Sequence, residues 1–192
     1  MDLREGISVV WQRWPILSSL LLLIAFGPIR AIAEVLALVA DGKFQEGAQG
    51  LGLLSSAIGL GALCVAIFQL AIGRRLLRNQ FLRHFAMATG FAASAAIVFA
   101  PSFQWALLAA LITGGASTFV GISLQVGIQE RLEDQLRGRV MSLWMLANTL
   151  SISAFAFAIS WLSEKIGLEI ATFTLITLGG LAVVAVLLRQ DE

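Results

Sequence analysis

The chain has 192 residues, of which 58% are hydrophobic and only 13% are charged, and its net charge is +1. A mean hydropathy of +0.88 is too high for an ordinary soluble domain, which would leave much of this apolar surface in contact with water. The near-neutral charge gives no sign of a nucleic-acid partner. The composition therefore indicates a protein whose principal partner is a lipid bilayer.

Six apolar segments follow one another along the chain, and each is close to the length of a membrane-spanning helix. A helix rises about 1.5 Å per residue and the hydrocarbon core is roughly 30 Å thick, so about 20 apolar residues make one crossing. The six segments cover residues 16–40, 51–73, 81–100, 105–127, 140–162 and 169–188. We therefore predict an all-α fold, a polytopic membrane protein with six transmembrane helices over residues 16–188.

Basic residues fall mainly on one side of this predicted bundle. Lys and Arg in short loops are retained on the cytoplasmic side of a membrane. With the N-terminus inside, most arginines lie in the inner segments, whereas Lys43 and Lys165 lie in the outer loops. Both termini, including the short tail at 189–192, are therefore predicted to be cytoplasmic.

The first 15 residues predict a helix that lies on the membrane surface. Apolar residues recur at helical spacing before Pro15 turns the chain inward, at Leu3, Ile7, Val10, Trp11 and Trp14. Charged and polar residues occupy the other positions, as expected of an amphipathic helix in the headgroup region. We interpret residues 1–15 as a cytoplasmic connector helix.

The sequence carries no pattern typical of an enzyme. It has no phosphate-binding glycine loop followed by Lys-Ser or Lys-Thr, no His-Glu-x-x-His and no Gly-x-Ser-x-Gly. With one cysteine and one histidine, Cys64 and His84, a catalytic triad or a metal site is hard to assemble. We expect no enzymatic activity, no cofactor and no metal.

The first predicted span contains two charged residues, Arg30 and Glu34. A charge near the bilayer centre costs at least about 2.5 kcal/mol and usually faces a cavity or a partner. Pro28, which follows Gly27, removes a backbone hydrogen bond and predicts a kink close to mid-depth. Glu34 is a candidate proton carrier and Arg30 a candidate site for an anionic group. The alternatives are an internal ion pair between the two, or a Glu34 that reaches toward the outer surface.

Two amides in later spans, Gln125 and Asn148, are further candidates for a substrate or proton pathway. Amide side chains also hydrogen-bond neighbouring helices with no further role. Small residues recur at packing intervals in two spans. They predict close contacts between helices, or helices that slide during a transport cycle. They are Gly52, Gly59 and Gly61 in the second span, and Ala110, Gly114, Ser117, Thr118 and Gly121 in the fourth.

Residues 129–142 read Gln-Glu-Arg-Leu-Glu-Asp-Gln-Leu-Arg-Gly-Arg-Val-Met-Ser. This stretch resembles the cytoplasmic loop before the fifth helix of the C-terminal half of major facilitator superfamily transporters, especially bacterial drug-efflux-like members. Those commonly read Gln-Glu-x-Val-Pro-x-Glu-Leu-Arg-Gly-Arg-Val, so Glu133 replaces the usual proline and Gln135 the usual acid. Residues 50–63 resemble the second helix of that half. The stretch from Gly73 to Arg78 resembles a degenerate copy of the basic loop motif, with Leu77 in place of its acidic residue.

The resemblance covers nearly the whole chain but only half of such a transporter. It implies one six-helix bundle in a bacterial inner membrane, paired with a second bundle that is either another copy or an N-terminal half. The implied function is secondary transport of a small molecule by alternating access, as efflux and with coupling to protons. The alternatives are a non-transporting scaffold or partner-binding subunit, and a truncated transporter fragment.

The resemblance also draws attention to a cluster of charged residues in the cytoplasmic loops. Such charges can lock helix ends together in one conformer and release them in the other, or they can simply be solvated residues that set the topology. The cluster consists of Arg74, Arg75, Arg78, Glu130, Asp134, Arg137 and Arg139.

Overall fold

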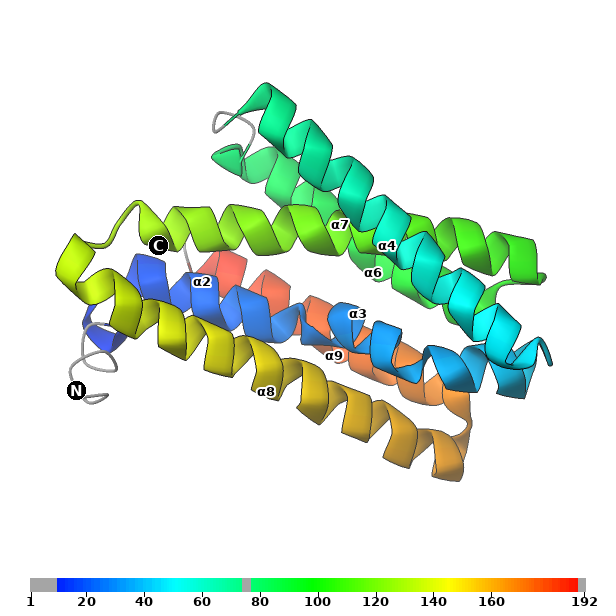
Figure 1. The fold of residues 1–192 in the computed structure, drawn as a ribbon. Helices are drawn as coiled ribbons and strands as arrows, with labels where there is room; N and C mark the ends of the chain where they lie inside the picture. The colour runs from blue at the N-terminus through cyan, green and yellow to red at the C-terminus, as the bar shows by residue number, and fades with distance from the viewer. Residues whose placement is uncertain (1–9, 74–76, 190–192) are drawn as a thin grey trace.

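The computed structural model describes residues 10–73 and 77–189, and this part of the chain is helical throughout, with no strand (Figure 1). Five helices are long and apolar enough to cross a membrane, and a bent pair of shorter helices makes a sixth if it counts as one span. The prediction of an all-α, multi-pass membrane fold is therefore confirmed. The five long helices are α4 (Gly47–Ile72), α6 (Gln80–Phe99), α7 (Phe103–Gln129), α8 (Asp134–Ile166) and α9 (Leu168–Leu188).

The first predicted span is a broken helix. It consists of α2 (Trp14–Ala25), α3 (Gly27–Ala31), the 3₁₀ turn η1 (Ile32–Val35) and the π-helix η2 (Leu38–Lys43). The two halves, Trp14–Ala25 and Gly27–Val35, meet at an angle of 41° directly before Pro28. The expected kink and the observed bend thus fall at the same residues.

The bend has a clear cause in the backbone. Pro28 has no N–H to donate to the carbonyl of Ile24, one turn earlier. The hydroxyl of Ser151, on α8, donates to that carbonyl instead, at 3.1 Å. Gly27 permits this contact, because a Cβ atom there would lie 2.1 Å from Ser151 Oγ and 2.6 Å from the ring of Phe155. The break therefore fits α8 closely.

The helices form two packed groups (Figure 1). One consists of α4, α6 and α7, and the other of α2, α3, α8 and α9. Buried side chains gather in two hydrophobic clusters along the bundle, one around Leu23 and Leu124 and the other around Leu36 and Leu54. Apolar burial inside a membrane gains little, so close packing must hold the groups together.

Glycine supplies that packing between α4 and α7. A Cβ atom at Gly61 would lie 1.8 Å from the carbonyl oxygen of Leu111, and one at Gly114 would lie 2.0 Å from that of Ile58. The two backbones therefore touch. In contrast, a Cβ atom at Gly59 would meet nothing within 4 Å.

Ion pairs lie at both ends of the bundle. At the end where α2 begins and α7 ends, which we name the arginine-rich end, Arg13 lies 3.9 Å from Glu133. At the opposite end Lys43 pairs with Glu169 at 2.9 Å and donates to the carbonyl of Val98. These contacts lie where headgroups and water would solvate them.

One predicted boundary differs from the structure, and two others lie largely outside the described residues. The loop expected at 128–139 shortens to 130–133, because α8 already begins at Asp134, whose carboxylate suits the first turn of a helix. Most of the predicted connector helix lies outside the described residues; of its described part, residues 10–12 are helical and α2 begins at Trp14. Of the predicted tail, only Arg189 is described.

Candidate functional site

A polar recess opens between α3, α7 and α8. Its volume is about 360 Å³, and three of the predicted pathway residues, Arg30, Gln125 and Asn148, line it together. They come from three helices that are distant in sequence, so the fold gathers them. We name this recess the Arg30 recess.

Arg30 is the charged group of the recess. Its Nη1 donates a hydrogen bond to Oδ1 of Asn148 across the gap between α3 and α8. Gly121 of α7 leaves room beside it, since a Cβ atom there would lie 4.0 Å from the same nitrogen. Among the described residues, no carboxylate lies within 4.0 Å of Arg30. The recess therefore holds a positive charge whose protein partner is neutral.

Glu34 does not join this group. It is exposed on η1, does not line the Arg30 recess and makes no ion pair with Arg30 within 4.0 Å. The physical reason is the local winding. Four residues along an α-helix turn about 40° past a full circle, whereas four residues along a 3₁₀-helix turn about 120° past it. Because the stretch from Arg30 to Glu34 runs from α3 into η1, the two side chains diverge.

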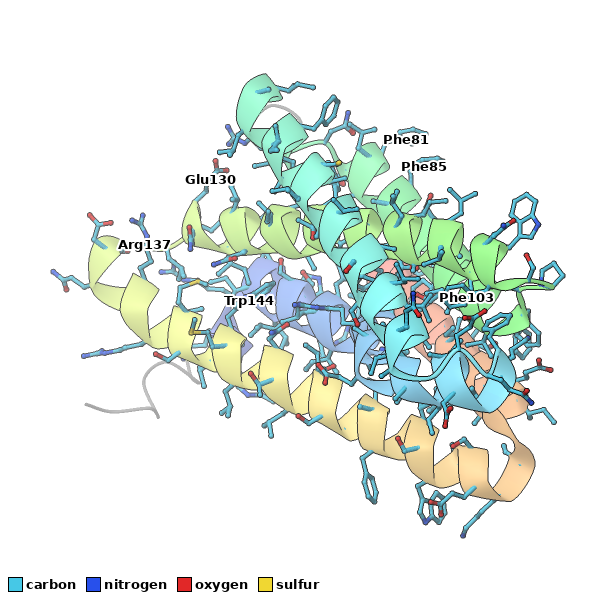
Figure 2. The ribbon with its side chains drawn as sticks, turned by 45° about the vertical axis from the view of Figure 1, so that its right-hand side comes forward. Phe81, Phe85, Phe103, Glu130, Arg137 and Trp144 are labelled. Atoms are coloured by element: carbon cyan, nitrogen blue, oxygen red, sulfur yellow. The ribbon has the colours of Figure 1, made fainter. Side chains whose placement is uncertain are left out.

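Further residues complete the recess. The hydroxyls of Ser117 and Thr118 line it from α7, and Trp144 lines it from α8. From the sequence we expected Ser117 and Thr118 to serve helix packing, and Trp144 was not among the expected site residues. Ser117 donates to the carbonyl of Gly114 on its own helix at 3.1 Å. Trp144 is only 6% exposed and lies on the side of α8 that faces the other helices (Figure 2). The signal for the two hydroxyls was their spacing on one helix, because Thr118 and Ser117 precede Gln125 by seven and eight residues, about two helical turns.

The predicted loop cluster divides into separate pairs. Arg78 pairs with Glu130 at 3.2 Å and so joins the segment before α6 to the end of α7. Arg137 pairs with Asp134 at 3.1 Å, three residues earlier on the same helix, and so joins nothing across the bundle. Figure 2 shows Glu130 and Arg137 at the same end of the molecule. Arg139 also lies on α8, and Arg74 and Arg75 lie outside the described residues.

No metal site is formed in the described part of the chain, where no three His, Cys, Asp or Glu side chains come together. The Arg30 recess is lined by a cation, two amides and two hydroxyls. Its guanidinium and amide donors suit an anionic or polar group, and the apolar faces of Ile122 and Met145 border them.

Comparisons with family models, with curated proteins and with solved structures found no match to this chain.

Proposed function

We propose that this chain is a secondary transporter, or half of one, that moves a small molecule with an anionic group across a membrane by alternating access. The observation that supports the proposal most directly is Arg30, a charge in the middle of a broken apolar span that faces an open polar recess. Efflux and coupling to protons are parts of the same proposal that rest on the resemblance of residues 129–142 to drug-efflux-like transporters.

The energetics of Arg30 favour a role in binding. A charged side chain near the bilayer centre costs at least about 2.5 to 3.5 kcal/mol, and a single amide partner such as Asn148 does not neutralise it. A small anion entering the recess would supply the missing negative charge. The recess volume of about 360 Å³ lies within the range of small-molecule sites.

The Arg30 recess also requires a cover. Met145, at its rim on α8, is 70% exposed. Lipid tails cannot solvate the guanidinium and amide groups inside it, so we propose that a second six-helix bundle closes the recess and that water reaches it from alternate sides. That bundle is either a second copy of this chain or a separate chain.

The rival function is a scaffold or partner-binding subunit without transport. It predicts the same second bundle but gives Arg30 no substrate to bind. Replacing Arg30 with an apolar residue of similar length separates the two functions. A transporter would lose flux, whereas a scaffold has no flux to lose and would keep its partner.

The experiment is a flux assay in proteoliposomes that contain the purified chain with any partner that copurifies. A panel of small organic anions is offered, and any transported member is retested with Arg30→Met, with Glu34→Gln and with Lys165→Met. Lys165 lies over the ring of Trp161 at the opposite end from the arginine-rich end, so its variant controls for loss of one positive charge. We expect Arg30→Met to abolish flux and Lys165→Met to leave it unchanged.

The Glu34 variant addresses the driving force separately. If Glu34 carries the proton, Glu34→Gln should abolish flux driven by a pH gradient but retain exchange of substrate between the two sides. Full flux in Arg30→Met would overturn the binding role of Arg30, whereas the absence of flux for every anion with the unaltered complex would favour the scaffold. Before the assay, the mass of the complex in nanodiscs should be measured, because a monomer without partners would leave the recess uncovered and contradict the paired arrangement.

A further inference from the structure

A second polar recess lies at the arginine-rich end of the bundle, away from the Arg30 recess. Its volume is about 230 Å³, and four helices form its walls, namely α2, α6, α7 and α9. We name it the Arg83 recess. None of its residues lines the Arg30 recess, and the proposed transport does not use it.

Hydrogen-bond donors converge on the Arg83 recess without acceptors. Ser123 of α7 is only 1% exposed, and its hydroxyl has no hydrogen-bond partner among the described residues. The same holds for the indole Nε1 of Trp14 on α2 and for Nε of Arg83 on α6. A buried polar group without a partner costs about 1–3 kcal/mol, so three such groups around one recess indicate a missing acceptor.

The recess is also strongly positive. Arg83 and Arg131 both line it, so two guanidinium groups border the same small recess. A third cation, Arg189, stacks on the ring of Trp14 at 4.6 Å. Two like charges that border one recess are stabilised by an anion between them.

The described carboxylates of this end of the bundle contact other arginines. Glu130 pairs with Arg78, and Glu133 lies 3.9 Å from Arg13. Within residues 10–73 and 77–189 neither Arg83 nor Arg131 forms an ion pair. Arg131 is held in place by the hydrogen bond from its Nη1 to the carbonyl of Pro15, at 3.3 Å. Within the described part of the chain, the positive charge of the recess is therefore not neutralised by a carboxylate.

We propose that the Arg83 recess binds a phosphate group. Arg83 and Arg131 would contact its charged oxygens, and Ser123 and Trp14 would donate to the others. A phosphate offers several acceptors to donors from several directions, and planar guanidinium groups match its geometry. Two sources share this chemistry: the headgroup of an anionic phospholipid and free phosphate.

The position of the recess bears on which of the two sources supplies the phosphate group. It lies near the first turn of α2 and the last turns of α7 and α9, where helices that cross a membrane reach the headgroups. Basic pockets between helix ends are typical sites for anionic headgroups, and indole side chains prefer the same depth. Leu22 and Leu187 supply an apolar wall beside the charged groups.

The test uses the full chain in a neutral detergent with two probes. One is phosphatidylglycerol, titrated against phosphatidylcholine and counted as bound lipid by native mass spectrometry. The other is inorganic phosphate, titrated at constant ionic strength against chloride and measured by the shift in thermal unfolding midpoint. The variants are Arg83→Met, Ser123→Ala and Arg137→Gln, the last a control that removes a charge at the same end but outside the recess.

We expect Arg83→Met to weaken binding of the preferred probe about tenfold or more, since hydrogen bonds to charged groups contribute most. Ser123→Ala should weaken it roughly threefold or more and, as a smaller change, serves if the arginine variant fails to fold. Selective retention of phosphatidylglycerol identifies the lipid as the source, and a shift with inorganic phosphate alone identifies free phosphate. Binding of neither probe, or an equal loss in Arg137→Gln, would overturn the proposal.

Discussion

The contact between α4 and α7 makes the sharpest prediction about stability. Gly61→Ala adds a single methyl group at a position where the carbonyl oxygen of Leu111 is 1.8 Å from the site of the new carbon. Ordinary van der Waals contact begins near 3.4 Å, so the two helices must separate locally by about 1.6 Å, and rigid backbone on both sides leaves no side chain to move aside.

The expected cost follows from this displacement. A gap of even about 0.5–1 Å forfeits a quarter to a half of the attraction between facing atoms, and overpacking of cores costs typically about 1–3 kcal/mol. In a membrane, packing is also the main attraction between helices, so little else offsets the loss. We expect Gly61→Ala to lower the free energy of unfolding by about 1–3 kcal/mol.

Gly59→Ala is the matched control on the same helix. Its new methyl group meets nothing within 4 Å, so only the intrinsic preference of alanine over glycine in a helix applies, which is about 0.5–1 kcal/mol in favour of the variant. Both free energies of unfolding can be measured in mixed micelles by raising the fraction of denaturing detergent. Equal stability of the two variants would refute the close approach of α4 and α7.

Two further substitutions test contacts between helix segments by the same unfolding measurement. Ser151→Ala removes the donor to the carbonyl of Ile24 and should cost about 0.5–1.5 kcal/mol; no loss would mean that the carbonyl freed by proline is satisfied otherwise. Lys43→Met should cost more than Glu169→Gln, which breaks only a half-exposed ion pair worth about 0–1 kcal/mol, because Lys43 also donates to Val98; equal effects would argue against that second contact.

Hydropathy and length predicted most of the fold because they act on long stretches. The segment predicted at 51–73 is α4 (Gly47–Ile72), and that predicted at 105–127 is α7 (Phe103–Gln129), each within a few residues. A span needs about 20 apolar residues whatever helices surround it, so its existence can be predicted from its own sequence. Its ends are less visible, because capping and first-turn charges such as Asp134 extend a helix beyond its apolar part.

The irregular winding of the first span was only partly predictable. Pro28 marks the break, since proline removes the same hydrogen bond in any context. The change to 3₁₀ winding in η1, which contacts α8, and to π winding in η2, which contacts α4, is not encoded by hydrophobic periodicity. For this reason the sequence allowed an ion pair between Arg30 and Glu34, whereas in the structure only Arg30 lines the recess and Glu34 is exposed.

The glycine rows illustrate a similar limit. Gly52, Gly59 and Gly61 are equivalent by composition and spacing rules for packing, yet only at Gly61 would a Cβ atom meet the neighbouring helix. The choice among them is made by the crossing of α4 over α7, which is a property of two helices together. The same reason explains why the Arg83 recess escaped sequence reasoning: Trp14, Arg83 and Ser123 belong to three different helices.

Several features that destabilise a spanning helix coincide within residues 27–35. They are a proline, a 3₁₀ turn and the charge of Arg30, with Ser151 and Asn148 of α8 as the polar groups that compensate them. Departures from local rules in a protein that otherwise obeys them are expected where function requires them. Arg30→Met should therefore retain or raise the free energy of unfolding while it abolishes flux. A variant that loses stability as well would show that Arg30 holds α3 to α8, and would assign it to packing.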